Sequence, residues 1–125
     1  MKQNKFSIKK RLESFYYAWN GIKILIKEEH NARIHLFATF LAISLGIYFS
    51  LSSVEWICLV LTIGLVISLE AVNSAIENIA DFISPEWHEQ IKKIKDLSAG
   101  AVLIAAIAAF FVGLILFLPK VNLKW

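Results

Sequence analysis

The sequence predicts an all-α integral membrane protein. Hydrophobic residues make up 58% of the 125 residues, and the mean hydropathy is +0.62. Three apolar stretches approach the roughly 20 residues that a helix needs to cross a bilayer, and an amphipathic segment precedes them. Three membrane spans leave almost nothing for a soluble domain, so residues 1–125 are expected to form one domain.

The amphipathic segment is expected to form a surface helix over residues 7–28. Its apolar residues recur at alternating steps of four and three, while polar and charged residues occupy the other faces. A helix of this kind lies in the membrane interface, where it can anchor the chain or contact substrate, and the two roles are compatible. The apolar positions are Ile8, Leu12, Phe15, Trp19, Ile22 and Ile26.

The three transmembrane helices are expected over residues 34–54, 56–83 and 97–118. Pro119 is expected to stop the third helix, because proline interrupts helical hydrogen bonding. Between the second and third spans, Ser84 and Pro85 are typical of the N-cap and first turn of a helix, so a short helix or turn is expected to lead back into the membrane.

The distribution of positive charge predicts the orientation in the membrane. Of 13 lysines and arginines, only Lys120 and Lys124 lie outside the N-terminal segment and the connection between spans two and three. The positive-inside rule therefore places the N-terminus and that connection in the cytoplasm. The net charge of +3 is accounted for by this excess, and nothing in the sequence indicates a nucleic-acid partner.

Four polar residues at the end of the second apolar stretch indicate a functional site. At 100° per residue, Glu70, Asn73, Glu77 and Asp81 fall within roughly 80° of arc on one helical face. A carboxylate at membrane depth costs about 2.5 to 3.5 kcal/mol on insertion scales. Several acids on one stripe therefore suggest chemistry or ion coordination, although a polar contact between packed helices is the alternative for each residue.

The depth of these acids suits a reaction between a lipid and a soluble co-substrate. Counting about 1.5 Å per residue, Glu70 lies roughly two thirds of the way across the hydrocarbon core and Glu77 at its cytoplasmic boundary. Glu29 and Glu77 could hold a magnesium ion, and Lys95 could hold phosphates. Glu70 could take a proton from an alcohol. The glycine-rich motifs of soluble ATP-binding folds are absent from the sequence.

Other functions and assembly states remain open on the residues alone. An acid stripe can also line the path of a small oligomeric cation channel or transporter, although Lys95 beside the acids would impede cations. A purely structural membrane subunit is a third possibility. Three helices can hardly enclose a pocket with polar walls, so the site is expected to be completed between the protomers of a homo-oligomer.

Several motifs together resemble the small prokaryotic diacylglycerol kinase family. EAVNSAIENIAD spans residues 70–81, WHE residues 87–89 and KDLSAGAVL residues 95–103, and AWNGI and EEHNARIH precede them. The resemblance implies a homotrimer in the bacterial plasma membrane, with active sites between subunits on the cytoplasmic side. It also implies ATP as co-substrate, Mg²⁺ as cofactor and a membrane lipid alcohol as acceptor.

The resemblance also implies roles for individual residues. Glu70 corresponds to the catalytic base of the family, and Glu29 and Glu77 correspond to its metal-binding glutamates, which also border the nucleotide. Asn73 and Asp81 fall at polar positions beside the site. The positions that contact nucleotide in the family are here Lys10, Tyr17, Glu86, His88, Lys95 and Asp96.

Two departures from the best-studied diacylglycerol-phosphorylating members bear on the substrate. Lys10 stands where those members have arginine, which loses the planar guanidinium fork. His35 stands where they have glutamate. In this respect the sequence is more similar to the Gram-positive branch of the family, whose members are mainly undecaprenol kinases. Undecaprenol is therefore the expected acceptor, and diacylglycerol is the alternative. His30 and His35 are themselves expected to be ordinary interface residues.

Overall fold

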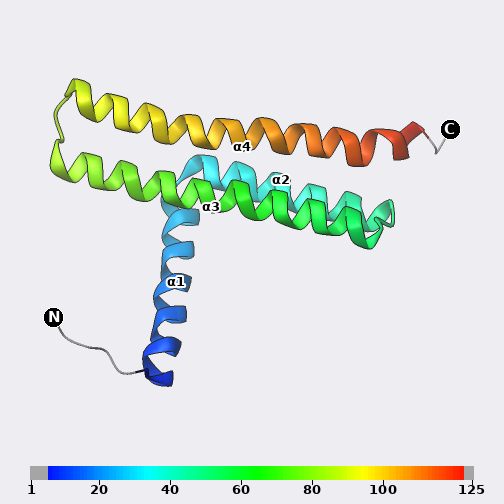
Figure 1. Cartoon of the computed structure of the whole chain (residues 1–125), viewed down its shortest axis with the longest axis horizontal. Helices are drawn as coiled ribbons and strands as arrows, with labels where there is room; N and C mark the ends of the chain where they lie inside the picture. The colour runs from blue at the N-terminus through cyan, green and yellow to red at the C-terminus, as the bar shows by residue number, and fades with distance from the viewer. Residues whose placement is uncertain (1–5, 123–125) are drawn as a thin grey trace.

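The computed structural model describes residues 6–122, and within this range the chain folds into four α-helices and no strand. Three helices, α2 (His30–Tyr48), α3 (Ser53–Ile83) and α4 (Glu89–Asn122), run side by side, and α1 (Ile8–Glu28) projects away from them (Figure 1). The first five and last three residues of the expected single domain lie outside the described residues.

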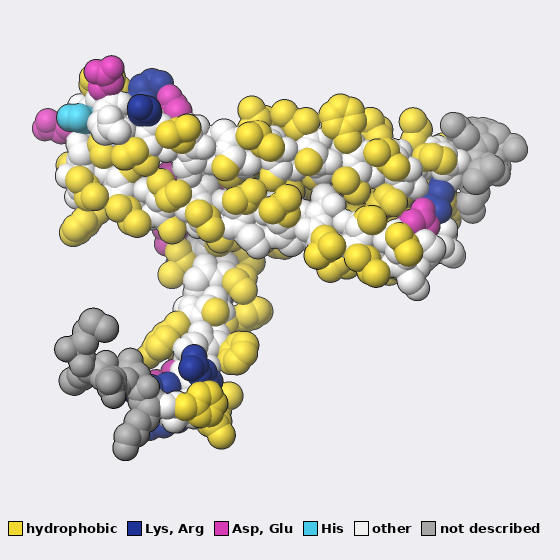
Figure 2. All heavy atoms as spheres, in the orientation of Figure 1, with side chains coloured by type: hydrophobic (Ala, Val, Ile, Leu, Met, Phe, Trp, Pro, Cys, Tyr) yellow, Lys and Arg dark blue, Asp and Glu magenta, His cyan; other side chains and the backbone are white. Residues whose placement is uncertain are grey.

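The surface of the helical bundle has the polarity expected of a membrane protein. Figure 2 shows hydrophobic side chains along the middle of the bundle and charged side chains gathered at its two ends. Among the described residues, two helices, Ser53–Ile83 and Glu89–Val121, are long and apolar enough to cross a membrane. An all-helical architecture with two candidate spans is therefore established.

The first expected span, residues 34–54, is not one helix. α2 ends at Tyr48, and the chain then turns at Ser50, which has the left-handed φ of 54°. The Leu51 N–H donates to the Gly46 carbonyl at 3.1 Å, and the Ser50 N–H donates to that of Ile47 at 3.2 Å, as in a Schellman motif. Because the chain reverses here, the apolar part of α2 is shorter than the expected span. The first helical turn of α2 is polar.

The connection between α3 and α4 also differs from the expectation. Ser84 ends α3, because its N–H donates to the Ala80 carbonyl while its own backbone is extended, so the predicted N-cap role of Ser84 and Pro85 is wrong. α4 begins at Glu89 and runs unbroken into the membrane segment. It also continues past Pro119 to Asn122, since a proline this close to a helix end disrupts few hydrogen bonds.

The buried apolar contacts gather at the end of the bundle remote from the acids. Leu51, Leu59 and Leu116 form a cluster with Trp56 and Phe117 packed against it. At the same end, Lys120 of α4 pairs with Glu55 of α3, with Nζ 3.0 Å from Oε2. Glu55 also completes a capping box with Ser52 at the start of α3. These contacts hold α3 and α4 together and thereby place the polar face of α3 opposite α4.

Candidate functional site

The predicted polar stripe lies on one uninterrupted helix, α3, so its members share a face. Glu70 is only 3% exposed, Asn73 and Glu77 are half-buried, and Asp81 is exposed near the end of the helix. Burial therefore decreases along the stripe from Glu70 to Asp81. The same gradient leads from the apolar middle of the bundle to its charged end.

Glu70 is paired with a histidine from the neighbouring helix. The Nε2 atom of His35, on α2, lies 3.1 Å from Oε1 of Glu70. The expectation that His35 is an ordinary interface residue is therefore wrong. Periodicity within one helix carries no signal for this pair, because the contact joins α2 and α3 and depends on how they pack.

Glu29 reaches the same face of α3 from the break between α1 and α2. Its backbone is extended, at φ −104° and ψ 112°, so the chain changes direction there and the side chain turns toward α3. The Ser74 hydroxyl donates a 2.8 Å hydrogen bond to Oε1 of Glu29. Ser74 is buried one turn beyond Glu70, and the sequence does not single it out.

A second chain of hydrogen bonds connects α4 with the stripe. The hydroxyl of Ser98 donates to Oδ1 of Asn73 at 2.6 Å. Asn73 in turn donates through Nδ2 to Oε1 of Glu77 at 3.2 Å. Ser98 is buried and was not expected at the site. The only sequence signal is that it is a small polar residue where α4 becomes apolar.

Charged groups converge around Glu77. Glu29, Asp81 and Glu70 repel its carboxylate, and Lys95 of α4 attracts it. Lys95 itself forms an ion pair with Asp81. The structure therefore brings together, in one chain, the predicted residues Glu29, Glu70, Asn73, Glu77, Asp81 and Lys95.

The acids fit a magnesium ion that shares its coordination with other ligands. Glu29 and Glu77 each use Oε1 in one hydrogen bond, and within the described residues their Oε2 atoms make none. No group of three or more His, Cys, Asp or Glu side chains in that part of the chain could hold a metal. Mg²⁺ needs only one or two protein carboxylates when phosphate oxygens and water complete its shell.

An apolar pocket of about 660 Å³ adjoins this cluster between α1, α2 and α3. Its walls are mainly aliphatic, contributed by residues such as Ile22, Leu25 and Ile67. Glu70 and His35 are its only titratable lining residues. A single chain therefore forms an apolar pocket with a carboxylate in its wall, although the sequence suggested that three helices could hardly enclose one with polar walls.

Two predicted nucleotide contacts, Lys10 and Tyr17, are not brought to the acids. Both are exposed on α1, which extends away from the bundle (Figure 1). The ring of Tyr17 contacts the ring of Tyr16, with centroids 5.8 Å apart. Within one chain, these side chains therefore cannot act together with Glu77.

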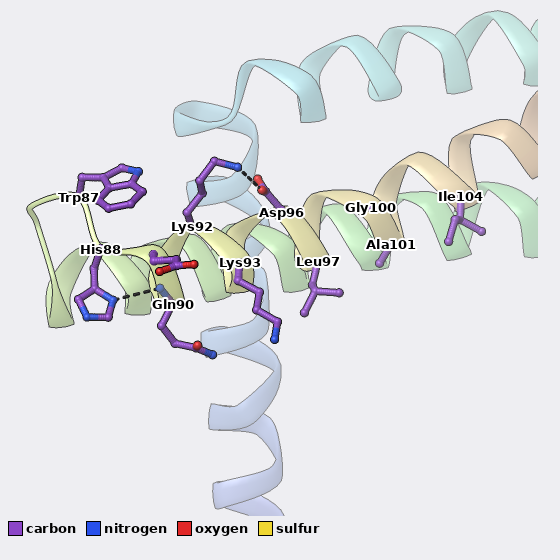
Figure 3. A pocket seen from close by; sticks show the side chains of 11 residues that line it. Trp87, His88, Gln90, Lys92, Lys93, Asp96, Leu97, Gly100, Ala101 and Ile104 are labelled. Carbon is purple, nitrogen blue, oxygen red and sulfur yellow. Dashed lines mark hydrogen bonds and ion pairs between the residues drawn. The ribbon is translucent and has the colours of Figure 1, made fainter.

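The remaining nucleotide positions lie around the start of α4. Glu86 and His88 belong to the connection between α3 and α4, where Nδ1 of His88 accepts a 3.1 Å hydrogen bond from the Gln90 N–H. Asp96 pairs with Lys92, with Nζ 2.5 Å from Oδ2. His88, Lys92 and Asp96 line a groove of about 1090 Å³ along α4 (Figure 3). Lys95 faces α3 instead, about 100° around the helix.

The fold and this arrangement define a class of protein: a small helical membrane protein in which an apolar pocket meets a carboxylate cluster with a lysine beside it. Comparison with known proteins identifies the family. The sequence profile described as prokaryotic diacylglycerol kinase matches residues 16–117, and the chain belongs to this family. The predicted resemblance is confirmed, and membership makes the chain a lipid kinase.

Individual relatives agree with this assignment. The chain is 35% identical to an undecaprenol kinase of Bacillus subtilis over 119 residues, which is 95% of the chain and 97% of that protein. It is 41% identical to a diacylglycerol kinase of Synechocystis over 86% of the chain and 62% of that protein. A diacylglycerol kinase of Escherichia coli is 33% identical over 74% of the chain and 76% of that protein.

Proposed function

We propose that the chain is an ATP- and Mg²⁺-dependent kinase that transfers the γ-phosphoryl group to undecaprenol and forms undecaprenyl phosphate. The observation that carries this proposal is the position of Glu70, whose buried carboxylate lies in the wall of an apolar pocket. The choice of undecaprenol is supported by the similarity to the Bacillus subtilis undecaprenol kinase over nearly the whole length of both chains. Diacylglycerol is the alternative acceptor.

Glu70 acts in this scheme as the general base. The pocket takes the hydroxyl end of the lipid, and the free oxygen of the carboxylate accepts the hydroxyl proton. The lipid oxygen then forms its bond to the γ-phosphorus while the bond from that phosphorus to the β,γ-bridging oxygen breaks, leaving ADP. Because a buried charge costs several kcal/mol, the burial of Glu70 is hard to explain without such a role.

The more exposed end of the stripe binds the nucleotide. Lys95 supplies a cation beside the acids, as phosphoryl transfer requires, and it lies near enough to act electrostatically on Glu77. Glu29 and Glu77 are the residues that would hold Mg²⁺, whose positive charge would offset the negative charge of the phosphates. The hydrogen bonds from Ser74 and Asn73 hold these two carboxylates in place.

Within one chain, several of the predicted nucleotide contacts lie away from the acids, and the proposed assembly brings them together. We propose a homotrimer in which Lys10, Tyr17, Glu86, His88 and Asp96 of one subunit contact nucleotide bound at the acids of another. α2 supplies a third membrane span when its apolar part is embedded, and the N-terminus and active site face the cytoplasm of a bacterial cell. The trimer is what the family resemblance implies, the orientation is supported by the charge distribution, and the sharing of the site is supported by the projection of α1 from the bundle (Figure 1).

The test is ATP-dependent phosphate transfer by the purified protein in mixed micelles. Undecaprenol and diacylglycerol are offered separately, and Glu70→Gln is the control for contaminating kinases. A clear preference for undecaprenol supports the proposal. A preference for diacylglycerol keeps the mechanism and overturns the acceptor, whereas no transfer to either lipid by the folded oligomer overturns the function.

A further inference from the structure

We infer that His35 is a positioning residue for Glu70. Its Nε2 atom lies at ion-pairing distance from Oε1 of the carboxylate and holds that oxygen, so that the second oxygen is directed at the hydroxyl of the lipid. This inference rests on the proposed function, in which Glu70 is the base. It adds a residue from α2 to a site whose other members come from α3, α4 and the α1–α2 junction.

Glu70 has one partner among the described residues, and that partner is the Nε2 atom of His35. Oε1 of Glu70 lies 3.1 Å from Nε2 of His35, and Glu70 has no other hydrogen-bond or ion-pair partner among the described residues. The side chain of Glu70 is 3% exposed, so water cannot replace this partner. His35 is 25% exposed and is therefore the more accessible member of the pair.

Two other polar side chains in the pocket wall have partners of their own, since Ser74 donates to Glu29 and Asn78 donates to the Ser74 carbonyl. His35 lines both the 660 Å³ pocket between α1, α2 and α3 and a second cavity of about 270 Å³ between α2, α3 and α4. Apart from this pair, neither cavity has a titratable lining residue. Glu29, the nearest acid of the α1–α2 junction, is engaged with Ser74 instead.

A fixed carboxylate matters because proton transfer depends strongly on geometry. The glutamate side chain rotates about several bonds, and mainly aliphatic walls do little to hold its charged end. A misplacement of the reacting group by about 1 Å can cost roughly 100-fold in rate. A single partner on Oε1 restricts this rotation and leaves the other oxygen free, as catalysis by one carboxylate oxygen requires.

The experiment compares three substitutions of His35 in the full-length protein, with turnover measured at saturating ATP and lipid. The amide nitrogen of His35→Gln reaches about as far as Nε2, whereas that of His35→Asn reaches only as far as Nδ1. His35→Leu has no donor. Gln should stay within about threefold of the wild-type turnover, and Asn and Leu should lose roughly tenfold or more, with the KM of both substrates little changed.

The matched control is Thr39→Val, one turn along the same helix. The Thr39 hydroxyl donates only to the His35 carbonyl, at 2.8 Å, and this variant should keep the wild-type turnover. Equal activity of Asn, Leu and wild type would overturn the inference, as would equal impairment of Gln and Asn or a change confined to KM. A wild-type protein without activity would overturn the proposed function and this inference with it. If the wild type is active, a result against the expected order of the variants counts against the role of His35 alone.

Discussion

At the scale of single residues, Glu70 is the most deeply buried polar or charged side chain among the described residues. It lies 3% exposed beside one histidine, in a wall that is mainly aliphatic. Structural stability does not require a carboxylate there, because apolar residues of similar volume often replace buried ion pairs without loss. The position of Glu70 is therefore better explained by the reaction than by the fold.

Replacement of the proposed base should separate chemistry from binding. Glu70→Gln retains the size and polarity of the side chain but cannot accept the hydroxyl proton, so turnover should fall by roughly 100-fold or more. Nucleotide binding should survive, because the groups proposed to hold ATP are elsewhere. Initial rates and ATP binding by calorimetry measure the two effects. Glu28→Gln, at the exposed end of α1, is the matched control, and near-normal turnover of Glu70→Gln would remove it from this role.

The neighbours Glu28 and Glu29 offer an internal comparison for the metal site. Glu29 is half-buried and bonded to Ser74, whereas Glu28 is exposed. Glu29→Gln and Glu77→Gln should each raise the Mg²⁺ concentration for half-maximal activity about tenfold and weaken nucleotide binding, because each removes a charged ligand. Glu28→Gln should leave the Mg²⁺ titration unchanged. Identical titrations for all three variants would exclude Glu29 and Glu77 as ligands.

At the scale of elements, the long uninterrupted α3 is what makes the site possible. The helix carries the acids from the apolar middle of the bundle to its charged end without a break. The turn between α2 and α3 sets how closely α2, and with it His35, approaches this face. Gly46 lies in the last turn of α2, and its carbonyl accepts the hydrogen bond from the Leu51 N–H.

A side chain at Gly46 should loosen this packing. A Cβ atom there would lie 2.7 Å from Cη2 of Trp56 and 3.0 Å from Cδ1 of Leu51, so Gly46→Ala forces a shift. The cost of overpacking, about 1 to 3 kcal/mol, exceeds the gain in helix propensity of about 1 kcal/mol. The midpoint of thermal unfolding in detergent should therefore fall. Gly64→Ala, where nothing lies within 4 Å of the new atom, should not lower it, and equal midpoints would contradict the packing argument.

At the scale of the whole molecule, one chain presents two separate halves of a site. Lys95 faces the acids of α3, whereas His88 and Asp96 line the groove along α4 (Figure 3). Adjacent residues on a helix point about 100° apart, so Lys95 and Asp96 face different surfaces of the chain. We therefore expect the nucleotide held at the acids to be contacted by Asp96 of another subunit.

Mixed oligomers test this division. Glu70→Gln and Asp96→Asn should each be nearly inactive alone. When equal amounts of the two chains assemble together, about a quarter of the sites should combine an intact Glu70 with an intact Asp96 from the neighbour, if partners are chosen at random. Activity should therefore recover to about a quarter of the wild-type value in the coexpressed and copurified mixture. Absence of recovery in an oligomer shown to contain both chains would place the whole site in one subunit.

Much of the molecule is predictable from local pattern. The helical fold, the course of α1 and the shared face of Glu70, Asn73 and Glu77 follow from hydrophobic periodicity and from 100° per residue, which are properties of single helices. The helix ends are less predictable. Serine followed by proline begins a helix in many proteins. Here the hydrogen bond from the Ser84 N–H to the Ala80 carbonyl makes Ser84 the end of α3.

The sequence by itself determined the membrane class, the family and the acid stripe, because hydropathy, motif spacing and helical period are recorded along the chain. Tertiary structure decided that His35 meets Glu70, that Ser74 holds Glu29 and that Ser98 reaches Asn73 from α4. It also decided that Lys95, and not Asp96, faces α3. Each of these contacts depends on the rotation and depth of one helix against another, and those are set by side-chain packing between segments far apart in the sequence.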